Sequence, residues 1–192
     1  MYSFRNPFFF VVFLFLSSCA RPVAFNRPDI QQYQAKIPLK AHFYMEKSLR
    51  DKMYSSRAFS SGIANRWDVP IGETTYTYAI SYLKSAFETF EEIDTPNPKD
   101  GYNILIEVTD INYSMKGQAA HCDLNFVLVN QDGKEVWNKQ YNQDGPSGFG
   151  RVLAVGAFGQ KSAIRQSTHV VLENIFKNLV RDIENKYQDW EM

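Results

Sequence analysis

Apolar and polar residues first alternate regularly over residues 39–46. The apolar positions fall on one side of an extended backbone: Leu39, Ala41, Phe43 and Met45. A period of two residues predicts a strand with one buried face. A second strand is expected over residues 63–69, because the turn-forming sequence Pro70-Ile71-Gly72 follows it directly.

A period of three to four residues replaces this alternation in residues 73–93. The apolar positions form one continuous stripe: Tyr76, Ala79, Ile80, Leu83, Ala86, Phe87 and Phe90. Such a stripe predicts an amphipathic helix that packs on a sheet. Residues 94–101 concentrate Pro, Asp, Asn and Gly, so they are expected to end this helix.

Three further strands are predicted in the centre of the chain. Residues 102–113 are rich in β-branched side chains, and residues 119–129 alternate between apolar and polar. An Asp132-Gly133 turn then leads into residues 135–141. Two strands joined by Asp-Gly form a hairpin, so these segments predict an antiparallel meander.

A second amphipathic helix is predicted over residues 161–187. Its apolar stripe comprises Ile164, Val171, Leu172, Ile175, Phe176, Leu179 and Ile183. Two helices and four to five mostly antiparallel strands, each with one apolar face, predict an α+β two-layer sandwich. The expected order over residues 37–192 is β-β-α-β-β-β-α.

The first 18 residues have the layout of a secretory signal peptide. Arg5 supplies positive charge, residues 8–16 are all apolar, and Ser17 and Ser18 are small. Nine helical residues span about 14 Å, short of the roughly 30 Å hydrocarbon core of a bilayer. A transmembrane helix is therefore disfavoured.

The sequence Leu16-Ser17-Ser18-Cys19 resembles the bacterial lipobox. The resemblance implies that Cys19 is acylated, for example with palmitate, and becomes the first residue of the mature chain. Several acyl chains give a stable membrane anchor. In this family, Ala rather than Asp at position 20 favours the outer membrane, with the protein facing the periplasm. The alternatives are a conventional signal peptide with a chance cysteine, or a retained anchor.

Residues 19–36 are expected to form a lipidated tether that lets the folded domain stand off the membrane. Pro22 and Pro28 disfavour helix there. The alternative is that this segment is an irregular first turn of the domain, and the two interpretations are compatible.

The composition argues against a nucleic-acid-binding protein and against a fold held by disulfides. Lys+Arg and Asp+Glu both number 21, so the basic excess typical of nucleic-acid-binding proteins is missing. Acylation of Cys19 would leave Cys122 as the single thiol, with no internal disulfide.

Residues 145–160 hold five glycines, but their spacing fits neither the phosphate loop nor the dinucleotide fingerprint. A packed or flexible connection is favoured. The sharper alternative is an apolar lip that contacts a partner or an acyl chain; it would comprise Phe149, Val152, Leu153 and Phe158.

No metal, cofactor or catalytic residue is predicted. Strand alternation sends His121 and Cys122 to opposite faces, where they cannot share a metal ion. Glu91 and Glu92 are expected to be solvated at a helix end, and Asp110 is an isolated carboxylate within a strand. Cys122 is expected to be a core residue.

The order of elements over residues 37–187 resembles small Gram-negative envelope lipoproteins, among them the lipopolysaccharide-assembly lipoprotein. The resemblance is one of pattern, with no functional residue to carry over. The lipobox, the absence of catalytic motifs and the apolar side chains of the glycine-rich segment favour a non-enzymatic binding or assembly factor for an envelope protein or lipid. An accessory lipoprotein of a transporter or secretion system is the alternative, and a lipid-anchored hydrolase is the less favoured one.

Overall fold

The computed structural model describes residues 20–30, 33, 35–57, 66–97, 101–147 and 157–190. The strands in these ranges are β1 (Ala20–Pro22), β2 (Ile37–Met45), β3 (Tyr54–Arg57), β4 (Arg66–Val69), β5 (Phe87–Glu92), β6 (Ile104–Lys116), β7 (Ala119–Asn130) and β8 (Glu135–Asp144). The helices are α2 (Lys47–Arg50), α3 (Ile71–Ala86), α5 (Ala157–Lys186) and the short 3-10 helix η3 (Tyr187–Asp189).

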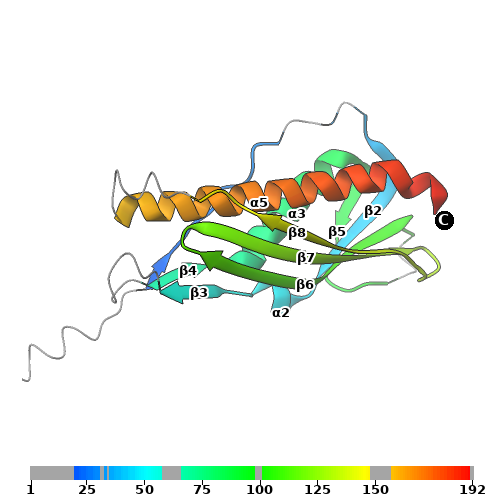
Figure 1. Cartoon of the computed structure of the whole chain (residues 1–192). Helices are drawn as coiled ribbons and strands as arrows, with labels where there is room; N and C mark the ends of the chain where they lie inside the picture. Colours follow the sequence, from blue (N-terminus) through cyan, green and yellow to red (C-terminus); the bar gives the residue numbers. More distant parts are fainter. Residues whose placement is uncertain are drawn as a thin grey trace, which may run out of the picture.

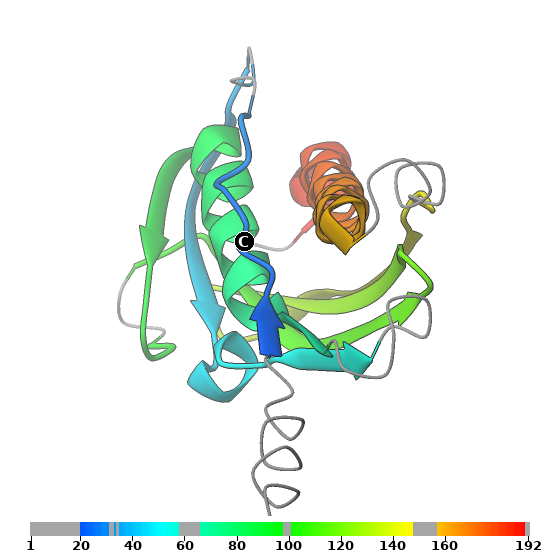
Figure 2. The same cartoon turned by 90° about the vertical axis from the view of Figure 1, so that its left-hand side faces the viewer.

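A mixed five-stranded sheet with the order β5-β2-β6-β7-β8 forms one layer (Figure 1). Helices α3 and α5 form the other layer, and the sheet curves around them in the view along its strands (Figure 2). A separate small sheet, β1-β4-β3, lies at one end. The predicted α+β two-layer sandwich is confirmed.

The antiparallel meander β6-β7-β8 is confirmed. Gly117 and Gly133, which have φ values of 66° and 77°, form the two turns, in a conformation that favours glycine. A bulge between Val108 and Asp110 shifts the register of β6 by one residue. Because of this shift, the residues of β6 that face the core are even-numbered before the bulge and odd-numbered after it. Ile111 and Tyr113 therefore stay on the buried face.

The predicted helix over residues 73–93 is wrong at its C-terminal end. Helix α3 ends at Ala86, and Phe87 has an extended backbone with φ −101° and ψ 150°. Residues 87–92 instead form the edge strand β5, parallel to β2. The backbone of β2 needs a hydrogen-bonding partner on this side, and that tertiary pairing outweighs the helical spacing of Phe87 and Phe90.

The N-terminal segment packs on the domain. Strand β1 pairs in parallel with β4, and the Val23 amide donates to the Asp68 carbonyl at 2.9 Å. The Val23 side chain is fully buried. In the described residues, this segment is therefore part of the folded domain, which was the alternative to a free-standing tether. Strands β1, β3 and β5 and the short helices α2 and η3 are additions to the predicted order, and β4 covers the described part of the predicted strand over residues 63–69.

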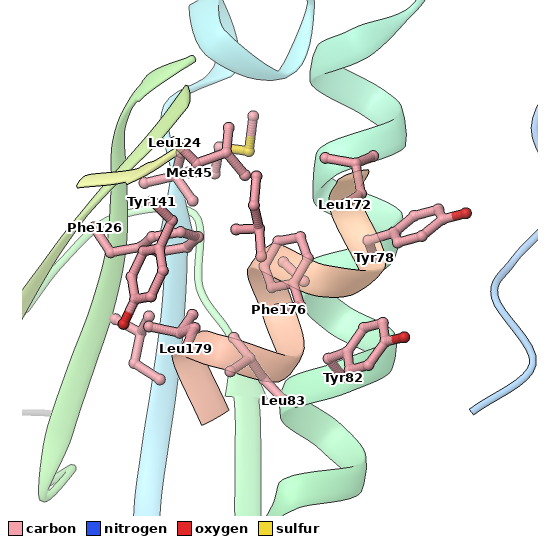
Figure 3. Close-up of a cluster of buried hydrophobic side chains, with 14 of the residues drawn as sticks. Met45, Tyr78, Tyr82, Leu83, Leu124, Phe126, Tyr141, Leu172, Phe176 and Leu179 are labelled. Carbon is pink, nitrogen blue, oxygen red and sulfur yellow. The ribbon is translucent and has the colours of Figure 1, made fainter. Parts of the chain in front are cut away.

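The core lies between the sheet and the two helices (Figure 3). The Phe176 ring of α5 stacks on Tyr82 of α3 at 5.9 Å and meets the edge of Phe126 of β7 at 5.7 Å. Cys122 is fully buried in the same core, as predicted. Burial of these large side chains supplies the main stabilisation of the sandwich.

None of the helices in the described ranges combines the length and the apolar character that crossing a membrane requires.

Candidate functional site

A cavity of about 770 Å³ lies between the N-terminal segment and the outward side of α3. We call it the basic groove. One wall is formed by Arg27, Pro28, Ile30 and Lys36 of the N-terminal segment. The other wall consists of α3 side chains three to four residues apart, which share one side of the helix: Glu73, Thr77, Ile80, Ser81 and Lys84.

The N-terminal wall is held in place by apolar contacts. Phe25, Ile30 and Tyr33 are partly buried against the core, on either side of Pro28. Proline cannot donate a backbone hydrogen bond, so Pro28 disfavours a helix or a paired strand in this stretch. The wall therefore follows α3 without forming secondary structure of its own.

The acidic side chains at the groove are already paired. Arg50 at the end of α2 donates from Nε to Glu73 Oε2 at 3.0 Å, and its guanidinium lies 3.6 Å from the centre of the Tyr76 ring. The Tyr76 hydroxyl donates to Glu92 Oε2 at 2.6 Å. Burial, with this bond to Glu92, raises the pKa of Tyr76 to about 12, while the bond to Glu73 raises the pKa of Arg50.

Three other basic side chains of the groove, Arg27, Lys36 and Lys84, have no ion-pair partner among the described residues. All three are exposed at its rim. Four basic residues line the groove against two acidic ones, Glu73 and Glu92, so the groove presents a surplus of positive charge. Such a surface attracts anionic groups of a ligand or partner.

A second cavity, of about 530 Å³, lies on the other side of Ile30, between the N-terminal segment and α5. Its charges are mixed: Asp29, Glu173 and Glu184 face Lys177 and Arg181. Glu173 and Lys177 form an ion pair at 2.7 Å. Its three acidic residues outnumber its two basic ones, so of the two cavities it is the basic groove that has a surplus of positive charge.

A polar contact links α3 to α5, and an ion pair within α5 adjoins it. The Tyr78 hydroxyl lies 2.6 Å from His169 Nδ1, and His169 Nε2 lies 3.5 Å from Glu173 Oε2. Figure 3 shows the hydroxyls of Tyr78 and Tyr82 pointing out of the apolar cluster. Burial raises the pKa of Tyr78 to about 12, so this hydroxyl remains protonated as a structural link between the helices.

A polar cluster occupies the face of the meander opposite the helices. His121 Nδ1 lies 2.8 Å from Asp144 Oδ1, and His121 Nε2 lies 3.5 Å from Asp123 Oδ2. Asn112 and Asn142 donate to the Asp123 carboxylate from the two neighbouring strands. The hydrogen bond with Asp144 is the main cause of a raised pKa at His121.

This cluster has the residue types of a hydrolase triad without its geometry. Ser114 is the register partner of His121 on β6. A general base, however, needs a neutral ring with a nitrogen directed at the nucleophile. Both nitrogens of His121 face carboxylates, and the raised pKa favours the imidazolium. The cluster is better suited to bind the three strands together than to activate a serine.

His121 and Cys122 lie on opposite faces, as the alternation predicted: Cys122 is buried and His121 lies on the outer face. Glu91 and Glu92 lie on strand β5 and not at a helix end, so that part of the expectation is wrong. Glu91 Oε2 lies 2.9 Å from His42 Nε2, and Glu92 accepts the Tyr76 hydrogen bond. Asp110 is exposed, 4.0 Å from Lys52 Nζ.

The residues predicted as sites from the sequence lie mostly outside the described residues. Cys19 precedes them, and Phe149, Val152 and Leu153 fall in the undescribed stretch between β8 and α5. The backbone of Phe158 belongs to α5, but its side chain is not among those described. The lipidation site and the apolar lip stay predictions.

The groove was missed in the sequence. Its α3 wall was visible as the polar side of the predicted helix, but the position of the N-terminal segment over that side depends on tertiary packing. Among the described residues, no group of three or more His, Cys, Asp and Glu side chains is arranged to hold a metal ion.

Comparison with known proteins gives little further information. No family model matches the chain, and no curated protein matches it. Among solved structures, it is similar to the hypothetical protein CT253 from Chlamydia trachomatis, with 10% sequence identity and a TM-score of 0.43. That alignment covers 78% of this chain and 96% of the other.

Proposed function

We propose that this chain is a lipid-anchored lipoprotein of the bacterial envelope, attached through Cys19 to the outer membrane and facing the periplasm. The observation that carries the proposal is the sequence Leu16-Ser17-Ser18-Cys19 directly after nine apolar residues. Its domain serves as a non-enzymatic binding or assembly factor for another envelope component.

The basic groove supports the binding part of the proposal. It offers a concave surface with Ile30 and Ile80 as apolar contacts and with basic side chains at the rim. No described residue forms an ion pair with Arg27, Lys36 or Lys84, so their charges are available to bind an anion. The partner chemistry that fits is an acidic segment of an envelope protein.

The anchor is tested by metabolic labelling with a fatty-acid analogue. The wild-type chain and the control Cys122→Ala should both incorporate the label, because Cys122 is buried and its thiol pKa is raised to about 12 by burial. Cys19→Ala should remain as an unlabelled, unprocessed precursor. Label retained in Cys19→Ala would exclude acylation at this residue.

The groove is tested by photo-crosslinking in cells. A photoreactive residue at Thr77, which lines the groove, should give a defined adduct, and one at Asn138, exposed on β8, should not. Charge reversal of Arg27 and Lys84 to Glu should reduce the Thr77 adduct severalfold. Reversal of Lys177 and Arg181, which line the second cavity, is the matched control and should leave it unchanged. Equal effects of the two double variants would rule out the groove as the binding surface.

The identity of the crosslinked protein also distinguishes this proposal from its alternatives. A transporter or secretion-system subunit in the adduct would favour the accessory lipoprotein. The carboxylates on both nitrogens of His121 weigh against the hydrolase.

A further inference from the structure

The chain leaves almost no spacer between the proposed anchor and the folded domain. Ala20 directly follows Cys19 and is already the register partner of Arg66 in β4. Consecutive Cα atoms are about 3.8 Å apart. Strand pairing over Ala20–Pro22 and the buried side chain of Val23 then fix this point to the body of the domain.

Strand β1 lies at one end of the long axis of the molecule. Figures 1 and 2 show β1, β3, β4, the turn between β6 and β7 and the beginning of α5 at this same end. Two contacts agree with the view: the Ala120 amide at the start of β7 donates to Ser167 Oγ, and the Met115 amide donates to the Tyr54 hydroxyl. The ten residues of α5 before Ser167 extend about 15 Å beyond that contact.

This end carries unpaired positive charge. Lys116 at the end of β6 and Lys161 and Arg165 near the start of α5 have no ion-pair partner among the described residues. The carboxylates nearby are engaged, Asp68 by Arg66 at 3.1 Å and Asp144 by His121. The first acidic residue of α5 is Glu173. Anionic phospholipid headgroups are the complementary surface.

We propose that this end of the domain, from β1 to the first turns of α5, rests directly on an anionic phospholipid surface, and that α5 points away from the membrane. The inference depends on the proposed acylation of Cys19. It replaces a mobile domain on a tether with a domain of fixed orientation.

Energy transfer from a protein label to an acceptor in the lipid headgroups tests this orientation. Ser162→Cys and Asn185→Cys place a donor at exposed positions near the two ends of α5. The two positions are 23 helical steps apart, which is about 35 Å, so transfer from position 162 should exceed that from position 185 at least about twofold. The acylated full chain in anionic vesicles is used, since buried Cys122 does not compete for the label.

A ten-residue Gly-Ser insertion between Cys19 and Ala20 provides the matched control. A flexible linker of this length has an end-to-end distance of about 17 Å, so the difference between the two positions should largely disappear. Equal transfer without the insertion, with acylation verified in the same sample, would overturn the orientation and leave the anchor intact. Absence of acylation would overturn the proposed function and the orientation together.

Discussion

At Gly72 two backbone oxygens occupy the space of a side chain. A Cβ atom there would lie 2.1 Å from the Leu49 carbonyl oxygen and 2.4 Å from that of Arg50. Glycine thus permits the close approach of α2 to α3 that places the Arg50 side chain at the basic groove. Glycine is needed at position 72 because it has no side chain, and not because of its backbone conformation, since its φ is not in the left-handed region.

Gly72→Ala should therefore destabilise the protein by about 2–3 kcal/mol, because backbone atoms cannot move aside as a side chain does. Gly101→Ala is the control: a Cβ there meets nothing within 4 Å, but φ is 65°. It should cost about 1 kcal/mol from backbone strain alone. Urea unfolding of both variants measures the difference, and an equal cost would contradict the close packing of α2 on α3.

The raised pKa of His121 makes its contribution to stability depend on pH. A group whose pKa is higher in the folded state stabilises the fold fully below its unfolded pKa of about 6.5, and this contribution is lost as pH rises through the folded pKa. Asp144→Asn removes the main cause of the shift. The stability difference between wild type and this variant should therefore be largest near pH 5.5 and shrink toward pH 9.

Unfolding free energies measured across this pH range check the prediction. Asp132→Asn, in the exposed turn before β8, is the control and should show a pH-independent difference. A difference for Asp144→Asn that grows with rising pH would be the wrong sign and would reject the ion pair with His121.

At the scale of elements, the local spacing of apolar residues was enough to predict a helix or strand wherever that element buries one regular face. The meander and both long helices could be predicted because their apolar positions repeat with a period of two or 3.6. Strands β1, β3 and β5 could not, because each is short and is defined by its partner. The serine-rich β3 pairs with β4, and β5 pairs with β2 although Phe87 and Phe90 also fit a helical stripe.

The candidate site could not be predicted for the same reason: it depends on how the N-terminal segment packs in the folded protein. The composition of this segment suggested a tether, and only the contacts of Val23, Phe25 and Ile30 show that it packs against the domain. The basic groove exists because of this packing, so it could not be seen in the sequence. The apolar lip was visible there, but the side chains of its four residues are not among those described.

Val23→Ala tests whether the segment is part of the fold. Removing two methyl groups from a fully buried valine should cost about 1.5–3 kcal/mol in the free energy of unfolding. Asn26→Ala in the same segment is exposed and should cost less than about 0.5 kcal/mol. Equal, negligible effects would mean that residues 20–30 are a detached tether after all.

At the scale of the whole molecule, one stretch of chain links the proposed anchor to the proposed binding surface. Cys19 is followed at once by β1, and the segment after β1 becomes a wall of the basic groove. The groove should therefore keep a constant distance from the membrane. A partner held there would be presented at a fixed height in the periplasm.

Acylation of Cys19 is the claim on which the anchor, the compartment and the orientation depend. Mass spectrometry of the N-terminal peptide of the mature protein, purified from membranes, tests it most directly. We predict a peptide that begins at Cys19 and carries the mass of a diacylglyceryl group, with or without a third acyl chain. A mature chain that retains Ser17 and Ser18, or begins at Cys19 with an unmodified thiol, would contradict the account.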